Sequence, residues 1–176
     1  MRRISLQPMV LSAAFTAVAV ALSGLSFPVG PVRCYPIQHA MNVVTGILLG
    51  PFWAVMSAFV ASLVRNAMGT GTLFAFPGSL FGALFVGLSA RYLSDKRVLF
   101  SALAEPMGTT LLGAATAAVV VAPFLGKSFG YSFFALSFFM SSVIGALLGA
   151  VSVKFLLKRL RGQMNKTDVV AALRRK

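Results

Sequence analysis

The sequence predicts an all-α integral membrane protein, a bundle of six transmembrane helices with both termini in the cytoplasm. Of its 176 residues, 58% are hydrophobic and only 11% are charged, whereas soluble domains average roughly 25% charged residues. The mean hydropathy is +0.88. The net charge of +13 arises from basic residues gathered mainly at the two ends of the chain. This distribution indicates membrane topology and disfavours a nucleic-acid partner.

The first predicted span covers residues 7–27, and it ends where Pro28, Gly30 and Pro31 prevent the helix from continuing. A signal peptide is the alternative interpretation of this segment, because two arginines precede the apolar run. The rest of the chain is equally apolar, which favours a retained membrane span.

The apolar segment 37–68 has one break at Gly50-Pro51, so it forms either one kinked helix or two spans, 37–49 and 51–68. Two spans give a total of six and place 13 of the 16 basic residues on one side of the membrane. A kinked helix gives five spans and moves eleven positive charges to the outside. The positive-inside rule therefore favours six spans. The outer basic residues are then Arg33, Arg65 and Lys127.

A short polar turn and a glycine-rich exit separate the remaining spans, which are residues 79–92, 98–122 and 134–157. The chain is thus predicted to be one membrane domain, residues 1–160, followed by a basic cytoplasmic tail, residues 161–176.

Reactive side chains are scarce, with one His, one Cys and three acidic residues. No paired carboxylate or zinc-binding motif is present, and Gly126-Lys127-Ser128 lacks the earlier glycine of a phosphate-binding loop, since that position is Val121. The sequence therefore predicts neither an enzyme nor an ATPase, and no cofactor or metal. Uphill transport would draw on an ion gradient or on a partner.

Polar residues within apolar spans are costly and are candidate functional residues. Here they form two clusters on the predicted outer side, and together these predict a small-molecule site. The first cluster comprises Arg33, Gln38, His39 and Asn42; the second comprises Arg65, Asn66, Thr70, Thr72 and Phe76, the last as a stacking ring. The alternative for Arg65 is snorkelling, in which its head group reaches the outer interface.

Glu105 is the only acidic residue well inside a predicted span, about 10 Å along the helix axis from Val98. A carboxylate at that depth must pair, hydrogen-bond or protonate. Three roles remain open: ligand contact, a structural pair with an arginine, and proton coupling. On the first span, Ala13 and Ala17 belong to a stripe of small residues, which serves either internal packing or docking of another membrane protein.

The chain resembles the ThiW family over about residues 7–158. The most specific likenesses are Pro36-Ile37-Gln38-His39 with Asn42, then Ser62-Leu63-Val64-Arg65-Asn66, Gly69-Thr70-Gly71-Thr72 and Ala75-Phe76-Pro77-Gly78-Ser79. Proteins of that family are thiazole-specific S components, the substrate-capture subunits of energy-coupling factor (ECF) transporters.

The resemblance implies a six-helix subunit in the plasma membrane of a prokaryote that captures hydroxyethylthiazole, the thiazole precursor of thiamin. Its partners would be a transmembrane coupling subunit, docked through Ala13 and Ala17, and two ATPase subunits. The loop 28–36 would close over a thiazole stacked near Phe76, with hydrogen bonds from the polar clusters. Two alternatives stay open: the pyrimidine half of thiamin as substrate, and a stand-alone proton-coupled carrier that uses Glu105.

Overall fold

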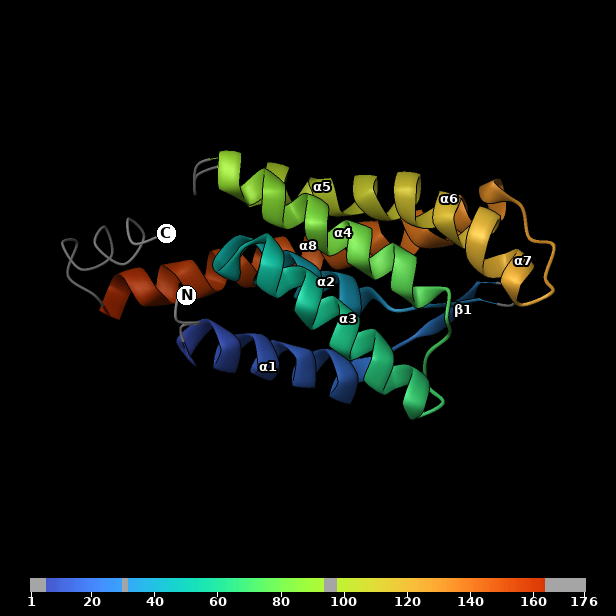
Figure 1. Cartoon of the computed structure of the whole chain (residues 1–176). Helices are drawn as coiled ribbons and strands as arrows, with labels where there is room; N and C mark the ends of the chain where they lie inside the picture. Colours follow the sequence, from blue (N-terminus) through green and yellow to red (C-terminus); the bar gives the residue numbers. More distant parts are fainter. Residues whose placement is uncertain (1–5, 30–31, 94–97, 164–176) are drawn as a thin grey trace, which may run out of the picture.

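The computed structural model describes residues 6–29, 32–93 and 98–163, in which the chain forms six helical rods and one β-hairpin (Figure 1). The first four rods and the sixth each consist of one α-helix, and the fifth is a continuous helical run with two π-helical stretches, Gly108–Gly113 and Ala117–Val121. The helices are α1 (Leu6–Ala21, extended by a 3₁₀ turn at Leu22–Gly24), α2 (Pro36–Leu49), α3 (Pro51–Ala67), α4 (Ala75–Tyr92), α5 (Val98–Met107), α6 (Ala114–Thr116), α7 (Ala122–Phe124) and α8 (Tyr131–Gln163).

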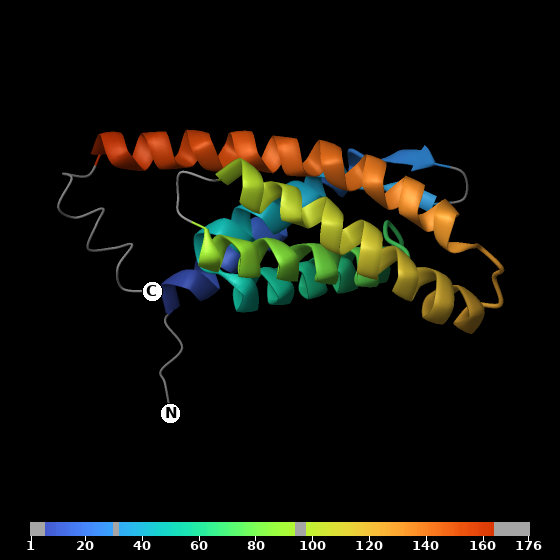
Figure 2. The same ribbon diagram turned by 90° about the horizontal axis from the view of Figure 1, so that it is seen from above.

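The rods lie side by side and the chain reverses direction from each rod to the next (Figures 1 and 2). The start of α1 and the end of α8 lie at the same end of the bundle, which we call the terminal end. The β-hairpin and α7 lie at the opposite end, which we call the hairpin end. Every second connection therefore falls at the same end of the bundle.

The expected loop after the first span is an antiparallel hairpin of β1 (Phe27–Val29) and β2 (Val32–Cys34), in which Phe27 pairs with Cys34 and Val29 with Val32. Sequence patterns do not reveal this hairpin, because prolines and glycine dominate the segment and each strand has only three residues.

Most element bounds lie within a few residues of the predicted spans. Gly50 separates α2 from α3 with a φ of 84°, a backbone conformation that interrupts helical geometry. Helix α4 begins four residues earlier than predicted, at Ala75, because the first turn after the loop already hydrogen-bonds helically. Helix α8 continues to Gln163, into the first residues of the predicted tail. The rest of that tail, 164–176, lies outside the described residues.

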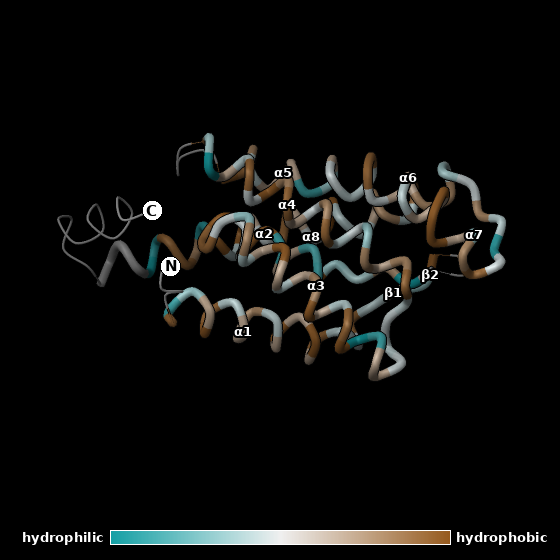
Figure 3. The backbone as a smooth tube through the Cα atoms, in the orientation of Figure 1, coloured by the Kyte–Doolittle hydropathy of each residue, from teal (hydrophilic) through white to brown (hydrophobic). Residues whose placement is uncertain are grey.

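The outer surface of the bundle is apolar and much of its interior is polar or small, the arrangement of a membrane protein. Large side chains such as Val119, Phe124 and Val151 are exposed, whereas serines and threonines are buried between the helices. Hydrophobic residues follow the rods along their length (Figure 3). Three helical segments are long and apolar enough to cross a bilayer by length and composition: Leu6–Gly24, Val98–Phe124 and Tyr131–Arg159.

Helix α2 lies inside the bundle, where it contacts α1, α3, α4 and α8. Nine of its 14 residues are buried, so other helices shield most of it from the surface. At about 1.5 Å per residue it is about 21 Å long, which is short of the roughly 30 Å of a hydrocarbon core. Because other helices shield α2, its first two turns can carry polar residues, and these residues form part of the site described next.

Close helix approach depends on glycines of α8 that face α2. A Cβ added at Gly145 would lie 2.4 Å from the Cβ of His39 and 2.5 Å from the carbonyl oxygen of Pro36. The glycine therefore lets the polar start of α2 pack directly against the α8 backbone, as the small-residue spacing in this helix suggests.

Candidate functional site

Polar side chains from five parts of the chain meet in a cavity at the hairpin end. The cavity measures about 30 Å³, which is room for about two water molecules. It is walled by the hairpin, the start of α2, the end of α3, the start of α4 and the first half of α8. Its lining residues are Arg33, Cys34, Tyr35, Gln38, His39, Arg65, Thr72, Ala75, Gly78, Ser79, Ser137, Phe138 and Ser141.

Arg65, in the last turn of α3, is buried with only 1% of its surface exposed. Its Nη1 donates a hydrogen bond of 2.9 Å to Oε1 of Gln38, and its guanidinium lies 3.6 Å above the ring centre of Tyr35. The hydroxyl of Tyr35 donates in turn to the carbonyl oxygen of Thr70. Arg65 therefore does not snorkel to an interface, because Tyr35 and Gln38 hold its head group inside the bundle.

Beside Arg65, the site contains a buried pair formed by His39 and Glu105, whose Nδ1 and Oε1 atoms lie 2.5 Å apart. The same oxygen accepts hydrogen bonds from Nδ2 of Asn42 at 3.2 Å and from Oγ1 of Thr109 at 3.1 Å. Because Oε1 is the shared acceptor, His39 donates from Nδ1. The structural partner of Glu105 is thus a histidine and not the arginine that the sequence analysis considered.

Space for the Glu105 carboxylate comes from α4. A Cβ added at Gly82 would lie 2.4 Å from Oε1 of Glu105 and 2.3 Å from Oγ1 of Thr109. The helical run that contains Glu105 changes from α to π geometry at Gly108, shortly after Glu105. Such π-helical stretches often occur at functional sites. Pro106 contributes to this break because it has no N–H to donate.

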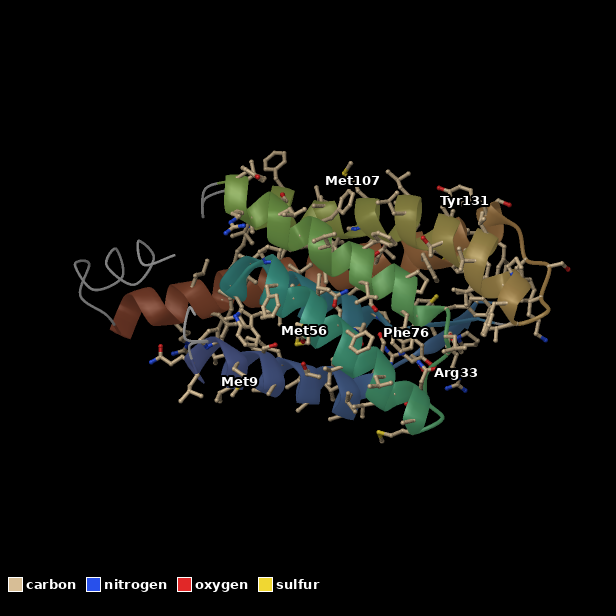
Figure 4. The ribbon with its side chains drawn as sticks, viewed as in Figure 1. Met9, Arg33, Met56, Phe76, Met107 and Tyr131 are labelled. Carbon is tan, nitrogen blue, oxygen red and sulfur yellow. The ribbon has the colours of Figure 1, made fainter. Side chains whose placement is uncertain are left out.

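Five of the sequence-predicted site residues line the cavity: Arg33, Gln38, His39, Arg65 and Thr72. Asn42 and Glu105 lie behind His39 as its hydrogen-bonded support. Three others support neighbouring elements outside the cavity lining. Asn66 donates to the carbonyl oxygens of Ser62 and Thr72, and the carbonyl oxygen of Thr70 accepts from Tyr35. Phe76, labelled in Figure 4, packs edge-on against Phe59.

Sequence reasoning predicted Arg33 of the hairpin but missed Cys34 and Tyr35, the lining residues of α4 and those of α8. Sγ of Cys34 donates to the carbonyl oxygen of Ser137, and the N–H of Tyr35 donates to Oγ of Ser141 at 2.9 Å. Ser137 and Ser141 are four residues apart and hence lie on one face of α8. Two hydroxyls on one face of an apolar span were the sequence pattern that could have predicted the α8 wall of the cavity.

Ala13 and Ala17 lie away from this cavity, in an open apolar groove between α1 and α3. Both alanines are exposed, so neither is used for packing inside the bundle. Met9 and Met56 also line the groove and mark its place in Figure 4.

Apolar helices around a cavity lined by polar side chains fit a membrane protein with a small-molecule site. The family model described as thiamine-precursor transporter protein (ThiW) matches residues 9–159. The chain therefore belongs to the ThiW family of thiamine-precursor transporters, a transporter family and not an enzyme family. No individual curated protein matches the chain.

Proposed function

We propose that this chain is the substrate-capture subunit, or S component, of an ECF-type importer, and that it binds hydroxyethylthiazole at the outer face of a prokaryotic plasma membrane. Family membership supports transport of a thiamine precursor. The observation that carries the proposal is the cavity at the hairpin end, where Gln38, His39 and Arg65 offer hydrogen bonds beside the ring of Phe138.

In this proposal the six rods are six membrane spans and both termini are cytoplasmic. The alternating direction of the rods and their shared terminal end support an even number of spans. The excess of basic residues at the chain ends and in the turn 91–97 favours the terminal end as the inner side. Residues 1–160 then form the membrane domain and residues 161–176 a basic cytoplasmic tail.

The bound thiazole lies against Phe138 and accepts or donates hydrogen bonds at His39 and Gln38. In this proposal Nε2 of His39, the ring nitrogen that does not contact Glu105, bonds the hydroxyl of the ligand. Phe76, the stacking ring expected from the sequence, packs against Phe59 instead, so we assign the aromatic wall to Phe138. Apolar walls with a few placed polar groups are typical of small-molecule sites.

Entry of the ligand requires movement of the hairpin, because the cavity has room for only about two water molecules. Strand β2 supplies Arg33 and Cys34 to the cavity wall, and Tyr35 follows directly. Displacement of this strand from α8 opens the cavity on the outer side. Its return encloses the thiazole.

Energy for uptake comes from the partner subunits, a transmembrane coupling subunit and two ATPases. The groove between α1 and α3, with Ala13 and Ala17 on its floor, is the docking surface in this proposal. Small residues permit the close approach of a partner helix.

Calorimetric titration of the purified chain tests the binding proposal. We expect hydroxyethylthiazole to bind and the hydroxymethyl pyrimidine precursor of thiamin not to bind. His39→Ala should weaken thiazole binding about tenfold, because it removes hydrogen bonds to a buried ring nitrogen. Thr116→Ala is the control, since that exposed hydroxyl bonds only its own helix. Tighter binding of the pyrimidine would refute the thiazole assignment.

The buried pair of His39 and Glu105 favours one second candidate, a proton-coupled carrier that works without partners. The two candidates differ in proteoliposomes that contain the chain alone and no ATP. A proton gradient drives thiazole accumulation only if the chain is a stand-alone carrier. Under our proposal, no thiazole accumulates in these proteoliposomes.

A further inference from the structure

Two of the three guanidinium nitrogens of Arg65 have no hydrogen-bond partner among the described residues. Nη1 donates to Gln38, whereas Nε and Nη2 are buried and unbonded. A buried donor without an acceptor costs free energy, about 1 to 3 kcal/mol each. Since Arg65 lines the cavity, a ligand there is the natural acceptor for both atoms.

The positive charge of Arg65 likewise has no carboxylate beside it in the described part of the chain. The sequence has only three acidic residues, and two of them, Asp95 and Asp168, lie outside the described residues. The third, Glu105, pairs with His39. The dipole of Gln38 and the ring of Tyr35 stabilise the cation. Among the described residues no carboxylate forms an ion pair with it.

The two unbonded nitrogens, Nε and Nη2, are also the pair of guanidinium donors whose geometry best matches a two-oxygen acceptor. Nε–H and the neighbouring Nη2–H point the same way along one edge of the guanidinium, and this fork matches the two oxygens of a carboxylate or phosphate. Nη1, which Gln38 uses, is on the opposite edge. Stacking on Tyr35 and the bond to Gln38 fix the guanidinium plane before any ligand binds.

We propose that the site recognises an oxyanion, and that the fork of Arg65 binds two oxygens of one carboxylate or phosphate group on the ligand. This inference rests on the proposed thiazole function and specifies its substrate class. The preferred substrate is an acidic thiazole, either a phosphate ester of hydroxyethylthiazole or a thiazole with a carboxylate. Arg33, which also lines the cavity, adds positive potential from β2.

Three probes that share the thiazole ring test this preference on the purified full chain. They are hydroxyethylthiazole, its phosphate monoester, and the thiazole acetic acid in which the hydroxyethyl group is oxidised to carboxymethyl. We expect at least one acidic probe to bind about tenfold or more tightly than the alcohol, since charge-assisted bidentate bonds are roughly twice as strong as neutral ones. Preference for the ester or for the acid identifies which group the site accepts.

Matched variants distinguish binding by the guanidinium fork of Arg65 from attraction by positive charge alone. Arg65→Lys keeps the charge but loses the fork, so the preference for the acidic probe should fall to within about twofold of the alcohol. Arg91→Lys makes the same change at an exposed arginine in the last turn of α4, outside the cavity lining, and should keep the preference. An equal preference in the wild-type chain and in Arg65→Lys would overturn the proposal.

The measurements on the wild-type chain test the oxyanion proposal even if Arg65→Lys does not fold. If the alcohol binds as tightly as both acidic probes, the oxyanion inference is wrong and the thiazole function stands. If none of the three probes binds, the thiazole function fails and the inference fails with it.

Discussion

Two buried ionisable side chains serve the cavity in different ways. Glu105 is 0% exposed and directs Oε1 to three donors, His39, Asn42 and Thr109. Arg65 is equally buried but uses only one of its nitrogens on the protein. The other carboxylate oxygen, Oε2, is buried without a hydrogen-bond partner among the described residues, as are Nε and Nη2 of Arg65. Arg65 lines the cavity and Glu105 does not, so we treat Arg65 as a ligand-binding residue and Glu105 as a positioning residue for His39.

Glu105→Gln should lower thiazole affinity about tenfold while the Tm changes little. The amide keeps the size of the side chain and an oxygen acceptor for Asn42 and Thr109, but it removes the charged acceptor that holds the hydrogen on Nδ1 of His39. Titration calorimetry and thermal unfolding of the same sample check both expectations.

Glu105→Ala is the comparison for that substitution. It removes the partner of Nδ1 of His39 and leaves Asn42 and Thr109 with only their backbone acceptors, the carbonyl oxygens of Ser79 and Gly78. It should therefore lower the Tm as well as the affinity. Wild-type affinity in the glutamine variant would contradict the positioning role, since the charge would then contribute nothing to binding.

At the scale of elements, the hairpin is attached mainly through the end of β2. Cys34 bonds to α8 through Ser137, the N–H of Tyr35 bonds to Ser141 of α8, and the hydroxyl of Tyr35 bonds to Thr70. These few bonds hold the wall of the cavity that must move for a ligand to enter. Their strength should therefore set the rates of binding and release.

Tyr35→Phe should accelerate both association and dissociation of the thiazole, the latter roughly fivefold. It removes one hydrogen bond, worth about 1 kcal/mol, while it keeps the ring beneath Arg65. Stopped-flow kinetics measure both rates. Tyr131→Phe is the matched control, because its hydroxyl bonds to Thr110 on an exposed surface away from the hairpin. Unchanged rates in Tyr35→Phe would mean that the hairpin does not gate the cavity.

The sequence predicted the helices well and the loops poorly. Hydropathy and helix breakers are strong local signals, so the break at Gly50 and the ends of the long helices could be read directly. The hairpin could not, because its two short strands are stabilised by contacts with α8 that lie more than 100 residues away. Tertiary contacts of this kind leave no periodic pattern in the strands themselves.

The candidate site was predicted in outline for a similar reason. The cost of polar groups in apolar spans identified Gln38, His39 and Arg65, all of which line the cavity. Side-chain direction in the loop after α3 depends on tertiary structure, and there Asn66 and Thr70 bond to the backbone instead of lining the cavity. Composition alone cannot distinguish these two uses of a polar residue.

At the scale of the whole molecule, the proposed topology places the hairpin end outside and the terminal end inside. Lys127, in the turn between α7 and α8, and Arg91, in the last turn of α4, are exposed at opposite ends of the rod formed by residues 98–124. Cysteine labelling at these two positions therefore tests whether that rod crosses the membrane.

A membrane-impermeant maleimide should label Lys127→Cys in intact cells and label Arg91→Cys only after permeabilisation. The native Cys34 adds little background, because burial raises the pKa of its thiol, although a hydrogen bond with Ser141 lowers it in part. A raised pKa keeps the thiol protonated and unreactive at neutral pH. The unsubstituted chain serves as the control. Labelling of both positions from outside would exclude the six-span arrangement.

The groove between α1 and α3 gives the molecule a second surface, separate from the cavity, on which a partner can dock. Ala13→Trp and Ala17→Trp should each fill the groove and abolish co-purification with the coupling subunit, because a helix can approach closely only over small residues. Ala14→Trp is the matched control, since Ala14 is an exposed alanine of the same helix that does not line the groove. Thiazole affinity should stay unchanged in all three variants, because no residue of the cavity lies on α1. A complex that survives both groove substitutions would mean that this face contacts lipid and that the partner binds elsewhere.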